Sequence, residues 1–310
     1  MKISRVGGLI AAASQKAARP TLQLGSITAV QRIVLTFQQA GIFPIAVVTG
    51  VEADEVKYRL SGRGVVFLHN TEFQDPELLD SIRLGLAFLQ DKCERVAFAP
   101  VNVPLFAPST LRALLKQGGD FVTPAVGGKG GHPIILSNRV IPDILSYIGS
   151  GGLRGAMAQM RCSRTRVDVA DEGIRLTFHE QTQLEAHLLA HQSSFIQPNL
   201  HFTLEQEDTI FSVRAKLLLL LIGETHSVRT ASDMMAMSIS KAWDTLNKLE
   251  AALGYPLILR RQGGTKGSGS DLTPRGQAFL QAFQQYEERA LAQSNLVYEE
   301  LLLSPGYLKP

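Results

Sequence analysis

The sequence predicts an α/β domain built on a doubly wound sheet, followed by a smaller and mostly helical domain. In the first half, short apolar runs alternate with amphipathic stretches, as strands and helices do when they follow one another along the chain. In the second half, three helix-like segments come in succession. The chain has 310 residues, of which 45% are hydrophobic, and this is enough for two cores.

Composition and charge narrow the possible classes of protein. The net charge is +3, so any nucleic-acid binding must be local. The two cysteines, Cys93 and Cys162, lie far apart without ligand-like neighbours, which indicates neither a disulfide scaffold nor a metal site. The stretch 1–18 has features of an export signal, but Gly7 and Gly8 interrupt its apolar run. We therefore expect a buried first strand, no membrane span and a cytoplasmic protein.

Four strand-then-helix units make up the first domain, which we place at residues 1–192. The pairs are 6–13 with 26–41, 44–50 with 53–62, 65–70 with 75–90, and 95–100 with 107–119. Such units predict parallel strands with right-handed crossovers and helices on both faces, a Rossmann-like arrangement. Thr28 fits a helix start and Gly41 a helix stop. Ligands of these sheets bind beyond the carboxyl ends of the strands.

A glycine-flanked turn, "GGKGGHP", leads into a further strand. Its glycines allow the backbone to approach a ligand closely, with Lys129 and His132 facing it. The alternative is a tight turn with a solvated lysine, and the sequence leaves both open.

The second domain, at residues 210–303, follows a linker and a leading strand at 193–209. Its helix-like segments are 213–223, 228–237 and 238–254. Apolar residues of the third segment recur at three- and four-residue steps and predict one buried stripe, which includes Trp243 as a core residue. The stripe consists of Ile239, Ala242, Trp243, Leu246, Leu249 and Leu253. Ser238 is suited to cap this helix and Gly254 to end it.

The stretch "RRQGGTKGSGSDLTPRG" comes after this helix. It lacks the GK[ST] ending of a phosphate-binding loop, and it joins two strand-like segments, which disfavours both a phosphate loop and a linker. Three helices and a basic hairpin predict a winged helix-turn-helix domain that binds double-stranded DNA, with the third helix in the major groove and the hairpin near the backbone. An ordinary solvated face is the alternative for the helix. The predicted contacts are Ser238, Ser240, Lys241, Thr245, Lys248, Arg260, Arg261, Lys266, Ser268 and Arg275.

The region 198–300 resembles the DNA-binding domain of molybdate-responsive transcription regulators, which is related to that of LysR-type regulators. The resemblance rests on "SKAWD", "LEAALGYPL" and "GGTKGSGSDLTPRG". It implies a homodimer joined partly through a long C-terminal helix. The molybdate-binding domains of these regulators have no counterpart in the sequence, so we expect any sensing to reside in the first domain.

The region 6–190 resembles the nucleotidyltransferases that attach CMP or GMP to molybdopterin. The similar stretches are "GLIAAAS", "VNVPLFAPSTLRAL", "GGHPIIL" and "VADEGIRLTFHEQTQLEAH". The family implies a glycine-rich first loop and aspartates that hold Mg²⁺. Here Ala13 stands at the loop glycine, Asn102 at the first aspartate, and Thr177 and His179 where a later aspartate is expected.

These departures predict a catalytically degenerate domain that is kept as a ligand sensor, with no catalytic residue and no metal ligand. A nucleotide, a molybdopterin or the molybdenum cofactor is the expected ligand. An active transferase with an attached regulatory domain is the alternative, and a scaffold for molybdenum enzymes is a third hypothesis. The predicted ligand contacts are Ala12, Ala13, Ser14, Lys16, Arg19, Asn102, Lys129, Gly131 and His132.

Overall fold

The structure, a computed structural model, describes residues 4–13, 19–50, 52–71, 78–177, 181–190, 195–261 and 269–308. The chain divides into two compact units. We call residues 1–59, 68–199 and 295–310 the α/β unit, and residues 60–67 and 200–294 the helical unit.

An eight-stranded mixed sheet forms the centre of the α/β unit, in the order β10-β7-β9-β6-β1-β4-β5 with β8 beside β7. The strands are β1 (Ser4–Ala12), β4 (Ile45–Thr49), β5 (Val66–His69), β6 (Cys93–Pro100), β7 (Phe121–Val126), β8 (Lys129–Gly130), β9 (Ile134–Ser137) and β10 (Arg164–Asp168). The first two residues of β5 fall within the range 60–67 that is assigned to the helical unit. A separate two-stranded ribbon pairs β2 (Gln23–Leu24) with β3 (Ile27–Thr28). Strand β1 runs parallel to β4 and β6, and β7 runs parallel to β10.

Strand β9, which lies outside the four strand–helix units expected to be parallel, runs antiparallel to both β6 and β7. Only residues 127–133 separate β7 from β9, and this connection is too short for the crossover that a parallel strand needs. The glycine-flanked turn predicted from the sequence therefore reverses the chain, and the further strand that it predicts is present.

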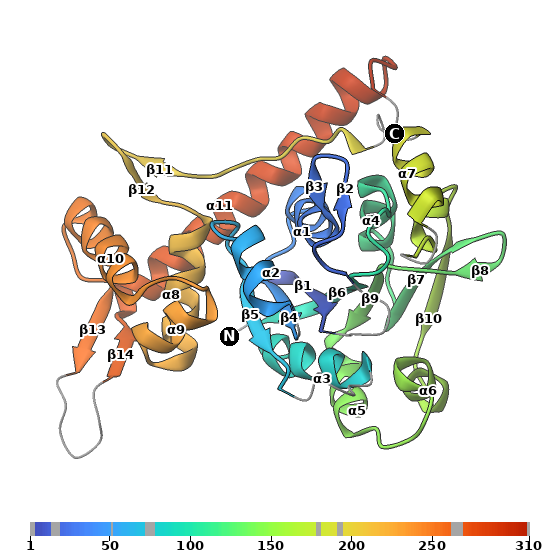
Figure 1. Ribbon diagram of the computed structural model, residues 1–310. Coiled ribbons are helices and arrows are strands. Elements are labelled where there is room, and N and C mark those ends of the chain that lie inside the picture. The colour runs from blue at the N-terminus through green and yellow to red at the C-terminus, as the bar shows by residue number, and fades with distance from the viewer. Residues whose placement is uncertain are drawn as a thin grey trace. The chain divides into compact units, whose positions relative to one another are not determined.

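Helices cover both faces of the sheet, as the alternating pattern predicts (Figure 1). Helices α1 and α4 pack on one face, and α3, α5 and α6 pack together on the other. The helices are α1 (Ala29–Gln39), α2 (Ala53–Arg59), α3 (Leu78–Leu89), α4 (Pro108–Leu115), α5 (Ile141–Ser146), α6 (Gly152–Gln159) and α7 (Gln181–Ala190). All four expected strand–helix pairs are thus present.

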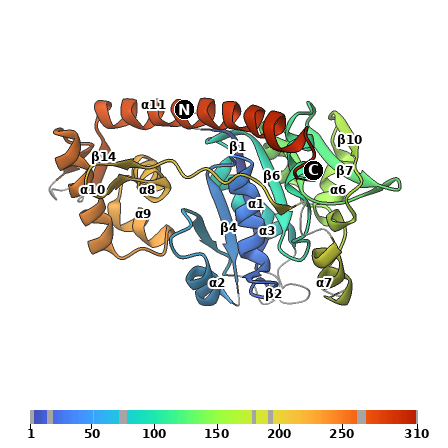
Figure 2. The ribbon, with the colours of Figure 1, turned by 90° about the horizontal axis from the view of Figure 1, so that it is seen from above.

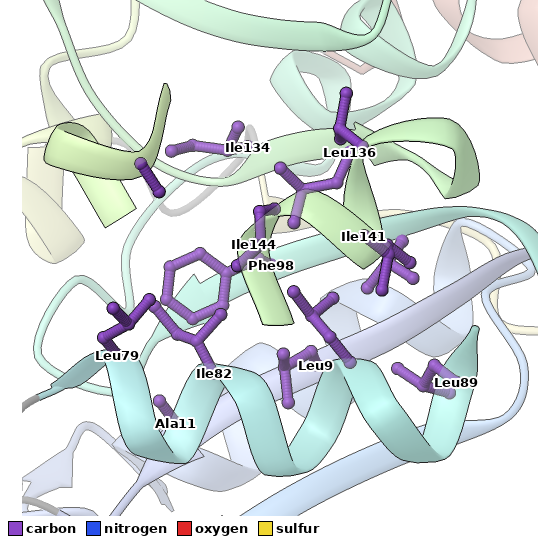
Figure 3. Close-up of a cluster of buried hydrophobic side chains, with 14 of the residues drawn as sticks. Leu9, Ala11, Leu79, Ile82, Leu89, Phe98, Ile134, Leu136, Ile141 and Ile144 are labelled. Carbon is purple, nitrogen blue, oxygen red and sulfur yellow. The ribbon is translucent and has the colours of Figure 1, made fainter. Parts of the chain in front are cut away.

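The core between the sheet and α3 consists of aliphatic side chains around Phe98 (Figure 3). Leu9 of β1 and Ile82 of α3 are almost fully buried, and each such side chain contributes roughly 1.5–3 kcal/mol when it leaves water. Helix α3 comes so close to β1 that a Cβ at Gly85 would lie 2.0 Å from Leu9 Cδ1. Any larger residue here would force the buried Leu9 side chain to move.

The ends of α1 follow the sequence prediction. The amide of Thr28 donates a 2.9 Å hydrogen bond to Oε1 of Gln31, which satisfies a donor at the helix start. Beyond the helix, Gly41 has φ 72°, the left-handed conformation that a helix stop requires.

The helical unit contains the predicted three helices and two-stranded wing. Its elements are β11 (Leu204–Glu205), β12 (Thr209–Phe211), α8 (Val213–Thr225), α9 (Val228–Met234), α10 (Ile239–Leu253), β13 (Ile258–Arg261) and β14 (Gly269–Leu272), and α11 (Pro274–Tyr298) begins here. Ser238 caps α10 by accepting from the amide of Lys241, and Gly254 ends it at φ 72°. Figure 2 shows α11 as one uninterrupted helix. Among the described helices, none has both the length and the apolar composition to span a bilayer.

Candidate ligand pocket and candidate nucleic-acid interface

A pocket of about 1160 Å³ opens on the α3 side of the sheet. Its floor is apolar and includes Ile82, Phe98 and Ile134, and its rim comes from α6 and β10. The lining residues within the described chain are Leu78, Leu79, Ile82, Phe98, Phe121, Thr123, Gly130, Gly131, His132, Ile134, Gly151, Gly152, Leu153, Arg154, Met157, Arg164, Thr165 and Arg166. A cavity with an apolar floor and a few polar groups is typical of small-molecule sites.

His132 presents a buried polar atom to this pocket. Its Nδ1 is buried and makes no hydrogen bond with the described residues, while its ring meets Phe98 edge-on with centroids 5.6 Å apart. Burial and, to a lesser extent, the nearby Arg154 guanidinium together lower the pKa of His132 from 6.5 to about 4. His132 is therefore neutral at pH 7, and its Nδ1 is free to form a hydrogen bond with a ligand.

Three arginines, Arg154, Arg164 and Arg166, give the rim of the pocket its charge. Arg164 donates to the carbonyl oxygens of Met157 and Met160, and Arg166 donates to Gly128 O at 3.3 Å. These partners are neutral, and no carboxylate is among the described lining residues. The pocket is therefore suited to an anion.

These arginines were not predicted as ligand contacts from the sequence, although the spacing of two of them along a strand could have indicated it. Arg164 and Arg166 alternate along β10, so their side chains share a face of the strand. Arg154 comes from a different segment, α6, and only the fold brings the three together.

Of the predicted ligand contacts, the pocket contains Gly131 and His132. Gly131 also has a packing reason, since a Cβ there would lie 2.4 Å from Ile174 O. Lys129 is exposed on β8 and is absent from the lining residues. Ser14 and Lys16 lie outside the described residues. The remaining predicted contacts lie elsewhere in the unit: Ala12 and Ala13 are buried, Asn102 is half-buried and Arg19 is exposed.

The Mg²⁺ that the resembling transferases imply does not fit the described residues. Asn102 supplies a neutral amide, which is a weaker ligand than a carboxylate. The carboxylate of Asp171 is already engaged: Oδ2 accepts from the Ala107 amide at 2.8 Å and from Thr110 Oγ1 at 2.6 Å, and Oδ1 accepts from the Gly173 amide at 3.0 Å. Asp171 thus holds the start of α4 in place.

The second site is the exposed face of α10 with the wing formed by β13 and β14. The side chains of Lys241 and Lys248 are exposed and have no hydrogen bond or ion pair with the described residues. Ser240 is exposed beside them, and half-buried Thr245 donates to Lys241 O at 2.8 Å. These four residues give the helix a polar and positively charged surface.

Two further predicted contacts, Arg260 and Arg275, are partly engaged within the unit. The Arg260 guanidinium lies 5.0 Å from the Trp243 ring centroid and bonds Asn247 Oδ1 at 2.8 Å and Glu250 Oε2 at 3.2 Å. The Arg275 guanidinium lies 3.8 Å from the Tyr255 ring centroid. Both cations therefore help to hold the wing and the start of α11.

The buried stripe of α10 is present but less complete than expected. Ala242, Leu246 and Leu249 are buried, whereas Trp243 is only half-buried. The Trp243 ring lies at the edge of the core, where the Arg260 guanidinium lies over its face. Lys266, Ser268 and the side chain of Arg261 lie outside the described residues.

Glu250 joins α10 to the wing, and sequence reasoning missed it. Its Oε1 accepts from the amides of Leu257 at 2.7 Å and Ile258 at 3.0 Å, while Oε2 pairs with Arg260. One carboxylate thus fixes the first strand of the wing against the helix.

Comparisons with known proteins follow the same division of the chain. The family model of the MobA-like NTP transferase domain matches residues 6–165, and that of the bacterial regulatory helix-turn-helix protein, lysR family, matches residues 215–277. The molybdenum-pterin-binding protein MopB of Rhodobacter capsulatus is 33% identical over 66 residues, which is 21% of this chain. The chain spans only 24% of the length of this relative.

Similar solved structures each cover about 60% of this chain. A nucleotidyl transferase from Methanothermobacter thermautotrophicus has a TM-score of 0.52 at 20% identity, covering 60% of this chain and 98% of its own. Rv0371c from Mycobacterium tuberculosis has a TM-score of 0.51 at 18% identity, covering 60% of this chain and 100% of its own. At such identities the likeness concerns the fold alone.

Proposed function

The chain belongs to the MobA-like NTP transferase domain family, and we propose that it is a transcription regulator in which the transferase-like domain senses a ligand instead of catalysing. The chain combines this domain with a LysR-type helix-turn-helix domain that supports DNA binding. The observation that carries the proposal is the pair of exposed cations without partners in the described chain, Lys241 and Lys248, on the third helix of that domain.

The effector in this proposal is a small anion with an apolar or ring-shaped part. The three arginines of the pocket suit the negative charge, and the floor around Phe98 suits the ring. A nucleotide, a molybdopterin and the molybdenum cofactor all have this character. The loss of catalysis is supported by Asn102 and by the engaged carboxylate of Asp171.

Three finer features complete the proposal. The regulated genes concern molybdenum, which the similarity to a molybdenum-pterin-binding protein supports. The active form is a homodimer joined partly through α11, where Tyr286, Leu296 and Val297 are exposed apolar side chains that a second copy can cover. The dimer acts in the cytoplasm, where a DNA-binding regulator meets its operator.

The direct test is binding to DNA upstream of the protein's own gene, measured by footprinting and at several salt concentrations. We expect log affinity to fall linearly with log salt, because lysines and arginines displace counterions from phosphates. Lys241→Glu should weaken binding by about 10-fold or more, equivalent to about 1.4 kcal/mol.

The matched control is Arg161→Glu, which makes the same charge change at an exposed residue of the α/β unit. It should leave affinity within about twofold. Equal losses of affinity for the two variants, or affinity that is independent of salt, would refute DNA binding through α10.

Ligand sensing is tested by thermal unfolding with CTP, GTP or a pterin phosphate. A ligand at ten times its dissociation constant should stabilise the α/β unit by about 1.4 kcal/mol. The double variant Arg154→Gln/Arg166→Gln should lose this stabilisation, whereas Arg161→Gln should keep it. Release of pyrophosphate from CTP or GTP in the presence of molybdopterin would instead identify an active transferase.

A further inference from the structure

A groove of about 420 Å³ lies between β12, the start of α8 and α10 in the helical unit. Its walls come from three segments that are separate in sequence, and none of the β12 and α8 residues is among the predicted DNA contacts. The lining residues are Thr209, Ile210, Ser212, Arg214, Ala215, Met237, Lys241, Asp244, Thr245, Asn247 and Lys248.

Three cations surround this groove: Arg214, Lys241 and Lys248. None of their side chains makes a hydrogen bond or an ion pair with the described residues. Asp244 is the one carboxylate among the described lining residues, so the groove carries a net charge of about +2.

Three other cations of the helical unit are held by protein partners. Lys216 pairs with Glu287, Arg260 bonds Asn247 and Glu250, and Arg275 stacks on Tyr255. Arg214 stands two residues before Lys216 on α8, yet it faces the groove instead of a carboxylate. A half-buried arginine with no partner in the described chain is suited to an external anion.

The groove is continuous with the face of α10 that carries Lys241 and Lys248, because both residues line it. Ser212 lies beside Arg214 at the N-cap of α8, where helix amides and the helix dipole also favour an anion. We propose that this groove holds the DNA phosphate backbone, and that Arg214 contacts a phosphate there and fixes how α10 enters the major groove. The inference rests on the proposed DNA binding and adds a contact outside α10 and the wing.

The test measures the salt dependence of DNA binding for the full chain and for Arg214→Gln, which keeps most of the side-chain length. The slope of log affinity against log salt should become shallower by about 0.9 for each phosphate that the variant no longer neutralises, and affinity should fall about 5- to 10-fold. Arg214→Lys, which restores the charge, should keep the slope of the natural chain. Arg161→Gln controls for the removal of one positive charge elsewhere.

The outcomes separate this inference from the function on which it rests. A natural chain that binds no DNA overturns both. DNA binding with a slope that Arg214→Gln leaves unchanged overturns the phosphate contact alone. Stabilisation of the natural chain by inorganic phosphate that Arg214→Gln abolishes, with an unchanged DNA slope, would assign the groove to a small anion and likewise overturn the proposed DNA contact.

Discussion

Lys216→Met is expected to lower the free energy of unfolding of the helical unit by about 3–5 kcal/mol. Lys216 is 5% exposed, and its Nζ lies 2.5 Å from Glu287 Oε2, which joins α8 to α11. Burial lowers the pKa of Lys216 and raises that of Glu287, so each group depends on the other to remain charged. Removing the lysine leaves a buried carboxylate without its cation.

The fluorescence of Trp243 follows this unfolding, since the chain contains one tryptophan and it lies on α10. We expect its thermal midpoint to fall by more than about 10 °C. The destabilisation should shrink as the pH falls, because the pKa of Glu287 in the variant is raised above its unfolded value and protonation removes the unpaired charge.

The matched control is the double variant Lys216→Met/Glu287→Leu. Replacing both members of a buried pair by apolar residues avoids the unpaired charge, so most of the stability should return. A double variant no more stable than Lys216→Met would show that the packing of Lys216, and not its pairing, stabilises the unit.

The sequence predicts the elements well where periodicity and end signals agree. The helix 239–253 has both an apolar stripe and caps at Ser238 and Gly254, and these local features determine its start and end. A strand after the glycine turn was predicted from the sequence, but no direction for it. The antiparallel direction of β9 follows from the connection, which is too short for the crossover that a parallel strand needs.

The sites were harder to predict because their residues come from distant segments. The pocket is lined by His132, which follows a turn, by Arg154 on α6 and by Arg166 on β10. Nothing in their spacing along the sequence indicates that these three residues lie close together. In the same way, Arg214 belongs to an apolar helix and becomes a candidate contact only because it lines the same groove as Lys241. Conversely, the sequence predicted that Arg260 is available for DNA. In the structure its guanidinium lies over the Trp243 ring.

The stability of the α/β unit is expected to depend on pH through His132. Because burial lowers its folded pKa from 6.5 to about 4, the unfolded chain binds a proton in this interval that the folded chain does not. The α/β unit should therefore lose stability as the pH falls through this window, by up to about 3 kcal/mol, and keep it above the unfolded pKa.

The measurement is urea unfolding followed by far-ultraviolet circular dichroism between pH 7 and pH 4. The matched variant is His132→Phe, which keeps a ring against Phe98 and removes the titration. Its stability should fall less steeply with pH than that of the natural chain, and parallel curves would contradict a buried neutral imidazole.

The same imidazole links pH to the proposed effector. An anion bound beside Arg154 and Arg166 adds negative charge near His132 and favours its protonated form, which raises the pKa of the ring. By linkage, the anion must then bind more tightly as the pH falls toward that pKa. His132→Phe should remove this pH dependence while the arginines still attract the anion, which separates the role of the imidazole from that of the positive rim.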